Sequence, residues 1–213
     1  MRSLVLCGLL ALLVACSTSG RPYEPTGGSA PRPVALAVSP HEPDEPMKLP
    51  SYIRFTDLQY ALTKPFKFRF RGTPHVVTVP SGFVTDFASI PAPFKPIFSR
   101  DPHDLPAVIH DYLYWRQSCK RDQADTLFRI GLRDMGISGL KADAMYRAVR
   151  IAGGSAWKAN ENDRAAGLPR VIPDAYLNVP VTTWKKYRAE LRRLQVALDP
   201  PDAEPPQYCS LSM

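Results

Sequence analysis

The chain is organised around two segments, GFVTDFASIPAP at Gly82–Pro93 and AVIHDYLYWRQSCKRDQAD at Ala107–Asp125. The first has no helical or strand periodicity, so we expect an apolar loop that packs on the domain. In the second, the link Ser118–Lys120 is short enough to join two antiparallel helices. We expect these helices at about residues 105–117 and 121–135.

The flanking sequence predicts a small antiparallel β-sheet before this helical hairpin and further helices after it, which is an α+β fold. Runs of alternating apolar and polar residues predict the strands, and glycines and prolines mark the ends of elements. The predicted strands are 51–56, 66–70 and 75–79; the further helices are 140–152, ended by Gly153-Gly154, and 183–198, with an irregular stretch at 160–173.

The N-terminus has the pattern of a targeting signal. A positively charged start precedes the apolar run Leu4–Val14, which is too short to span a bilayer. The run ends in Leu13-Val14-Ala15-Cys16, which resembles the bacterial lipobox. We therefore expect residues 1–15 to be a signal peptide and Cys16 to carry a lipid, whose methylenes each contribute roughly 0.8 kcal/mol of anchoring. Ser17 fits delivery to the outer membrane; an ordinary cleaved signal peptide with a chance cysteine is the alternative.

The rest of the chain is expected to form one globular domain behind a tether. Prolines crowd the region up to residue 50 and leave no apolar period, so residues 16–50 are expected to be an extended, solvated tether. Residues 51–198 suffice for a single hydrophobic core, and residues 199–213 are expected to be a loose tail. The formal net charge of +7 favours anionic partners, and the envelope location argues against nucleic acid.

Two cysteines, Cys119 and Cys209, remain in the expected mature domain. An envelope location permits disulfides. A bond between them would attach the C-terminal tail to the helical hairpin. Two cysteines give no framework pattern, however, so the sequence leaves their pairing open.

A histidine and three acids form the candidate site. His110 lies seven residues before the end of its predicted helix, and Asp125 lies four residues after the start of the next. At roughly 1.5 Å per residue the two side chains reach the same level of the antiparallel pair. A carboxylate that holds one imidazole nitrogen leaves the other to act as a base. Asp111, and Asp86 from the preceding loop, are oxygen ligands for a hard cation such as calcium, and a base with a cation suffices for ester or amide hydrolysis.

Four motifs resemble a domain-of-unknown-function family, number thirteen fifty-three, which is found in tailed phages and bacteria. The resemblance covers about residues 52–157 and implies no settled activity. The motifs are GFVTDFASIP at 82–91, AVIHDYLY at 107–114, RDQAD at 121–125 and MYRAVR at 145–150.

The helical pair also resembles the core of secreted phospholipase A2, most closely the short bacterial type. That family places His-Asp on one helix, a tyrosine four residues after the histidine, and an aspartate on a second, antiparallel helix. The resemblance implies that His110 activates water and that Asp111 binds calcium, with the loop Gly82–Ser89 completing the calcium shell. It also implies that Asp125 orients His110 and that Tyr114 supports Asp125. The glycine-rich calcium loop of the animal enzymes is absent.

Three functions remain open. The first is a calcium-assisted, phospholipase A2-like hydrolase that cleaves lipid esters at the membrane surface. Its catalytic residues would be His110, Asp125 and Tyr114, supported by Arg121 and Ser89. The second is a cell-wall hydrolase that cuts amide or glycan bonds. The third is a non-catalytic envelope or phage-related lipoprotein that binds a partner, in which the same charged residues form a structural ion network.

Overall fold

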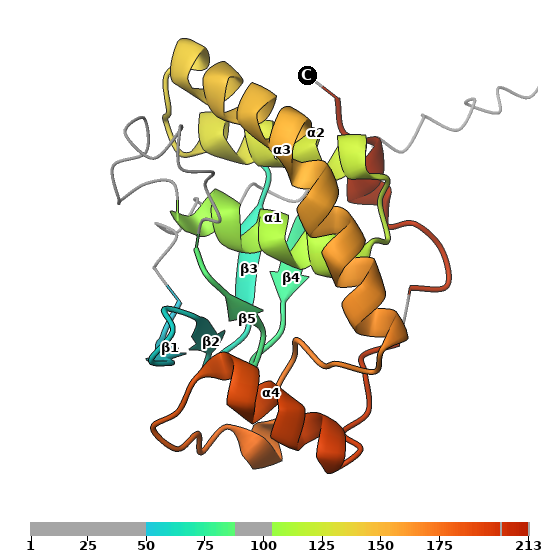
Figure 1. The fold of residues 1–213 in the computed structure, drawn as a ribbon. Coiled ribbons are helices and arrows are strands. Elements are labelled where there is room, and N and C mark those ends of the chain that lie inside the picture. Colours follow the sequence, from blue (N-terminus) through green and yellow to red (C-terminus); the bar gives the residue numbers. More distant parts are fainter. Residues whose placement is uncertain (1–49, 88–103, 201, 213) are drawn as a thin grey trace, which may run out of the picture. The chain divides into compact units, whose positions relative to one another are not determined.

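A computed structural model describes residues 50–87, 104–200 and 202–212 (Figure 1). The expected lipidation site Cys16 and the supporting residue Ser89 lie outside the described residues. In the described part, five short strands precede four α-helices. Small antiparallel sheets followed by helices confirm the predicted α+β class.

The strands form two separate antiparallel sheets in the described part, where a single sheet was predicted. In the first, with the order β1-β2-β5, Ala61 pairs with both Ile53 and Val84. In the second, β3 and β4 pair with Phe66 opposite Val79. Strand β5 lies in a stretch for which no strand was predicted, because two residues are too few to show a period. The strands are β1 Tyr52–Arg54, β2 Tyr60–Leu62, β3 Phe66–Arg69, β4 Val76–Val79 and β5 Val84–Thr85.

Three helices pack on one another, and α1 also packs on the β3–β4 pair (Figure 1). Helices α1 and α2 form the predicted hairpin, and their core residues Trp115 and Leu127 are fully buried. Helix α4 belongs to a second cluster, in which Trp184 lies 5.4 Å from Phe55 between ring centroids. The helices are α1 Asp104–Arg116, α2 Arg121–Asp134, α3 Gly139–Ala165 and α4 Trp184–Arg193, with 3₁₀ turns η2 Asp174–Tyr176 and η3 Gln207–Ser210.

Helix α3 is about twice as long as predicted, because Gly153-Gly154 does not end it. The helix runs on to Ala165, through much of the stretch that was expected to be irregular. Gly153 is needed for packing instead: a Cβ at this position would lie 2.3 Å from the hydroxyl oxygen of Tyr114. Helix α4 is conversely shorter than predicted, since Gln195, just past its end, has a left-handed φ of 55°.

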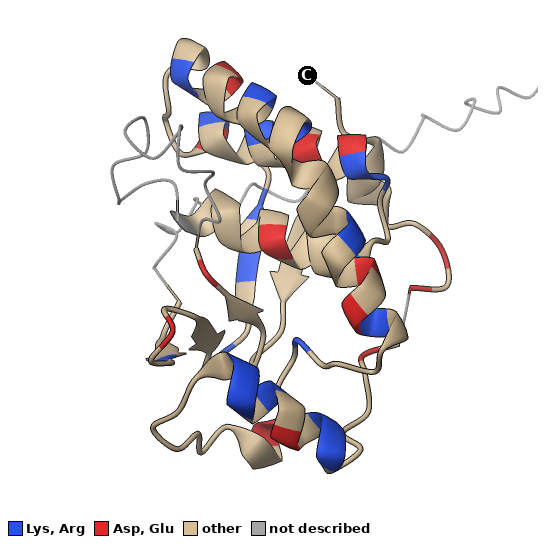
Figure 2. Cartoon of the chain, in the orientation of Figure 1, with Lys and Arg blue, Asp and Glu red and all other residues tan. Residues whose placement is uncertain are grey.

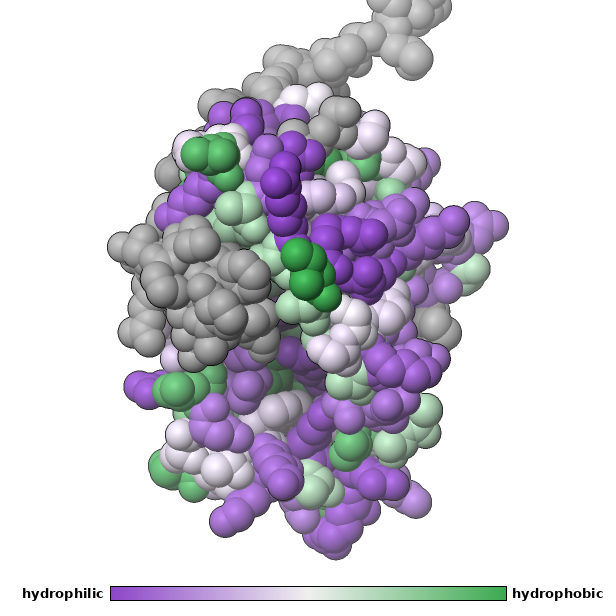
Figure 3. Space-filling view, turned by 45° about the horizontal axis from the view of Figure 1, so that its top comes forward, coloured by the Kyte–Doolittle hydropathy of each residue, from purple (hydrophilic) through white to green (hydrophobic). Residues whose placement is uncertain are grey.

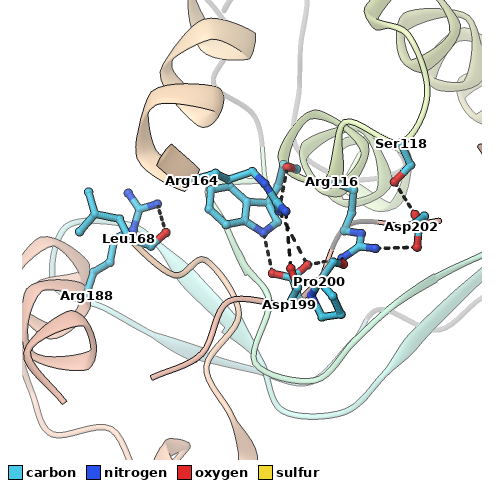
Figure 4. A network of polar contacts seen from close by, with 9 residues as sticks. Arg116, Ser118, Arg164, Leu168, Arg188, Asp199, Pro200 and Asp202 are labelled. Carbon is cyan, nitrogen blue, oxygen red and sulfur yellow. Dashed lines mark hydrogen bonds and ion pairs between the residues drawn. The ribbon is translucent and has the colours of Figure 1, made fainter. Parts of the chain in front are cut away.

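The C-terminal segment is held to the helical hairpin, which corrects the expectation of a loose tail. Cys119 and Cys209 form a disulfide, so the pairing that the sequence left open is present. Arg116 donates to the carboxylates of Asp199 at 2.5 Å and of Asp202 at 2.6 Å (Figure 4). These bonds connect residues more than 80 positions apart in the sequence. Periodicity relates only residues that are close in the sequence, so it could not predict them.

Within the described residues, no helix has both the length and the apolar character needed to cross a bilayer.

Candidate functional site

Asp125 of α2 is the centre of a buried polar network. Its side chain is fully buried, and its Oδ1 lies 3.0 Å from Nε2 of His110. The same oxygen accepts a hydrogen bond of 2.5 Å from the Tyr114 hydroxyl. Its other oxygen accepts from Arg150 at 3.0 Å and from Arg121 at 3.4 Å. Both carboxylate oxygens are therefore satisfied, as a buried charge requires.

The ring of His110 is held in place by contacts with two other rings. Its centroid lies 4.1 Å from that of Tyr114 and 4.8 Å from that of Phe128. The residue is buried, with 8% of its surface exposed, so little of the side chain reaches solvent. The bond to Asp125 occupies Nε2, which leaves Nδ1 as the nitrogen that can accept a proton from a reacting molecule.

The network keeps Asp125 ionised. Burial alone would raise the pKa of its carboxyl, but hydrogen bonds from His110 and Tyr114, and the nearby charges, hold that pKa below its usual value. Burial and the hydrogen bond to Asp125 raise the pKa of Tyr114, so the phenol stays protonated and donates. A carboxylate fixed in this state can orient an imidazole and stabilise its protonated form.

Asp111, next to His110 on α1, lies beside strand β5. Its Oδ2 accepts a hydrogen bond of 2.6 Å from Thr85, whose side chain in turn accepts from the backbone N–H of Phe87 at 3.0 Å. Burial of the carboxyl, and then the neighbouring carboxyl of Asp86, raise the pKa of Asp111 to about 7. Loss of solvation is thus the main reason for the raised pKa, and repulsion between the two neighbouring carboxyl groups adds to it.

This pair of carboxyls fits the chemistry of a hard cation. Asp111, Asp86 and the Thr85 hydroxyl supply oxygen atoms, which calcium prefers, and a cation would offset the repulsion between the two acids. The set is small, because the described residues contain no group of three or more acidic, histidine or cysteine side chains arranged to hold a metal. Further oxygen ligands would come from backbone carbonyls, water, substrate or side chains that lie outside the described residues.

The sequence predicted most of the contacts in this site. It placed His110 level with Asp125, put Tyr114 in support of that acid, and named Arg121 among the supporting residues; all of these contacts occur. It named Asp111 and Asp86, which are neighbours. The contribution of Ser89 stays a prediction, since that residue lies outside the described part.

The sequence patterns did not point to three residues that take part in the site. Arg150 reaches Asp125 from α3, 25 residues along the chain, and Thr85 reaches Asp111 from β5. Gly153 allows α3 to approach Tyr114. Arg150 and Thr85 lie within the motifs MYRAVR and GFVTDFASIP, so motif membership was the one available signal. The doubled glycine was noticed, but it was interpreted as a helix end.

Comparison with known proteins identifies a family and no activity. Residues 60–149 match the family model described as "Protein of unknown function (DUF1353)", a narrower range than the 52–157 expected from the motifs. The matched segment runs from β2 into α3 and contains His110, Asp111 and Asp125. The chain matches no curated protein and no solved structure.

Proposed function

We propose that this chain, whose residues 60–149 are a domain of the DUF1353 family, is a membrane-tethered hydrolase that cleaves an ester with water, assisted by calcium. The observation that carries the proposal is the 3.0 Å contact between Nε2 of His110 and the buried Asp125. A purely structural histidine needs no carboxyl pair nearby. Here Asp111 is the next residue on α1, and the carboxyl of Asp86 is its neighbour.

In this mechanism Nδ1 of His110 takes a proton from a water molecule, whose oxygen attacks the carbonyl carbon of the ester. The carbon–oxygen bond to the leaving alcohol then breaks, and the alcohol takes the proton back from His110. Asp125 holds the ring and stabilises its charged form, while Tyr114, Arg121 and Arg150 hold Asp125. A calcium ion bound by Asp111 and Asp86 would polarise the ester carbonyl.

Location is part of the proposal. A lipid on Cys16 would place the domain at a bacterial envelope membrane, the outer membrane in our expectation, within reach of phospholipid esters. The net charge, +7 for the full sequence and one less once Arg2 leaves with residues 1–15, supports attraction to anionic lipid surfaces.

The test is hydrolysis of phospholipid vesicles by wild-type protein and by His110→Asn, with calcium and with a chelator. We expect the variant to lose activity at least about 100-fold, the lower range for a general base. His75→Ala is the matched control, because His75 lies before β4 and makes no contact with the network among the described residues. Equal turnover by His110→Asn and wild type would contradict the proposal.

A second candidate is a non-catalytic binding lipoprotein. The observation that favours it is that Asp125 is fully buried and paired with two arginines, which is also how a purely structural ion network is built. Folded wild-type protein with no turnover on phospholipid or on peptidoglycan would support this reading. Turnover on peptidoglycan alone would instead support a cell-wall hydrolase that uses the same base.

A further inference from the structure

A pocket of about 510 Å³ lies between α4, the β1–β2 turn and the segment that follows α3. Cavities of this size hold small ligands or the polar part of larger ones. The pocket is lined by three cations, Arg170, Lys185 and Arg188, beside Trp184 and Asp57. Lysines and arginines cover much of α4 (Figure 2), and the lower part of the face in Figure 3 is largely hydrophilic.

Arg188 is a fixed positive charge. Its Nε donates to the carbonyl of Pro169 and its Nη1 to Asp163, both at 2.6 Å. Its guanidinium also lies 5.7 Å from the ring centre of Trp184 and 5.7 Å from that of Trp115. Its Nη2 donates to the carbonyl of Leu168 at 3.3 Å. A planar group held on several sides keeps its orientation, so little conformational entropy is lost when a ligand binds it.

Arg170 is equally fixed, but neutral groups hold it. Its Nε donates to the carbonyl of Val84 at 2.9 Å and its Nη1 to the amide oxygen of Asn160 at 2.8 Å. Among the described residues, no carboxylate forms an ion pair with it. Its charge favours the ionised form of Asp111. The carbonyl that it binds belongs to Val84, the neighbour of the Thr85 that donates to Asp111.

Positively charged side chains outnumber negatively charged ones in the lining of the pocket. Burial lowers the pKa of Arg188, Asp163 opposes that shift, and repulsion from Arg170 adds to it. Asp57 accepts the backbone N–H groups of Trp184 at 2.9 Å and Lys185 at 3.5 Å. That carboxylate therefore caps α4 and is engaged with backbone donors. The exposed amine of Lys185 makes no hydrogen bond within the described part of the chain.

We propose that this pocket binds a phosphate group. Two fixed guanidiniums match the oxygens of a phosphate, and a lysine amine adds a point charge at the mouth. Trp184 supplies an apolar wall for the organic part of a phosphate ester. Where the proposed hydrolase function holds, the inference defines its substrate as a phosphate-bearing ester that Arg170 anchors beside Asp111. The binding itself does not depend on His110.

The experiment compares two charge reversals on one helix, Lys185→Glu and Lys186→Glu. Both lysines are exposed, and the two substitutions change the net charge by the same amount. Lys185 lines the pocket, whereas Lys186 does not. The full chain is titrated with inorganic phosphate, and separately with monomeric dihexanoyl phosphatidylglycerol, at constant ionic strength in a calorimeter. We expect saturable binding, weakened at least about tenfold by Lys185→Glu and less than about twofold by Lys186→Glu.

The two ligands separate the sources of the phosphate. If wild type binds the lipid more tightly than phosphate and Lys185→Glu loses that binding, the ligand is a lipid headgroup. If wild type binds phosphate more tightly than the lipid and the same variant loses that binding, the ligand is inorganic phosphate. Equal weakening by both variants, or no saturable binding of either ligand, would overturn the proposal. His110→Asn is expected to bind as wild type does, so a failure of catalysis and a failure of phosphate binding are distinguishable.

Discussion

The hydroxyl of Tyr114 occupies the space that a side chain on Gly153 would fill: a Cβ there would lie 2.3 Å from the phenolic oxygen and 3.1 Å from Cζ. The same hydroxyl donates to Asp125 at 2.5 Å. The glycine therefore sets how closely α3 passes the candidate site, and the position of Tyr114 depends on it. A glycine within a helix costs roughly 0.5–1 kcal/mol relative to alanine, and the close approach explains why one stands here.

Gly153→Ala is expected to destabilise the domain by about 1–3 kcal/mol, because the added methyl overpacks a buried contact. Gly154→Ala is the matched control: nothing lies within 4 Å of a Cβ at that position. It should stabilise α3 by up to about 1 kcal/mol through helix propensity. Urea unfolding of both variants measures the difference, and equal effects of the two substitutions would disprove the packing role of Gly153.

Asp125→Asn should be among the most damaging conservative substitutions in the chain. It leaves Arg150 and Arg121 facing a neutral amide. Because both arginines are partly exposed and keep contact with water, we expect a loss of about 1.5–3 kcal/mol, the range for hydrogen bonds to a charged group. Asp122→Asn, on the exposed side of the same helix, should change the free energy of unfolding by less than about 0.5 kcal/mol. Denaturant titration at neutral pH provides both values, and a loss below 1 kcal/mol for Asp125→Asn would argue against a buried charge network.

Asp111 should make stability fall as the pH rises. The pKa of its carboxyl is raised from 3.8 to about 7 in the folded protein, so the folded state binds a proton that the unfolded state has released. This stabilisation is complete below about pH 4 and is lost as the pH rises through 7. Asp111→Asn removes the effect: in calcium-free buffer the variant should gain on wild type between pH 4 and 8 by on the order of 1–4 kcal/mol. A gain that does not change with pH would contradict this.

Calcium should stabilise the folded domain, and more strongly at pH 8 than at pH 5. A ligand that binds only the native state raises the melting temperature, and carboxyl ligands must be deprotonated to bind a metal. Thermal unfolding with increasing calcium measures the shift, with magnesium as the reference ion. Asp111→Asn should abolish the shift. A shift that survives this substitution would place any calcium site elsewhere in the chain.

The disulfide should contribute to stability by closing a long loop. Cys119 and Cys209 are 90 residues apart, and closing a loop of about this length restricts the unfolded chain by roughly 4–5 kcal/mol in the chain-entropy description. The double variant Cys119→Ser, Cys209→Ser should lower the free energy of unfolding by about 2–5 kcal/mol. Adding a reductant should destabilise wild type and leave the double variant unchanged; a response of both proteins would indicate another cause.

The helical hairpin and the residues of the candidate site on it could be predicted from local sequence patterns. A period of 3.6 residues places His110, Asp111 and Tyr114 on neighbouring positions of one helix, and a three-residue link brings Asp125 to the level of His110. These are local relations, set by backbone geometry. The α+β class follows in the same way from runs of alternating and helical periodicity.

Tertiary packing decided the rest. Arg150 completes the shell of Asp125, Arg170 binds the carbonyl of Val84, and Cys209 reaches the hairpin, each across a long stretch of chain. Several arginines occupy similar positions in the sequence pattern, so the sequence could not show which of them would be the partner of a buried carboxylate. The choice among them depends on which distant segment packs nearby and loses its water, because a buried carboxylate is stable only where a donor reaches it.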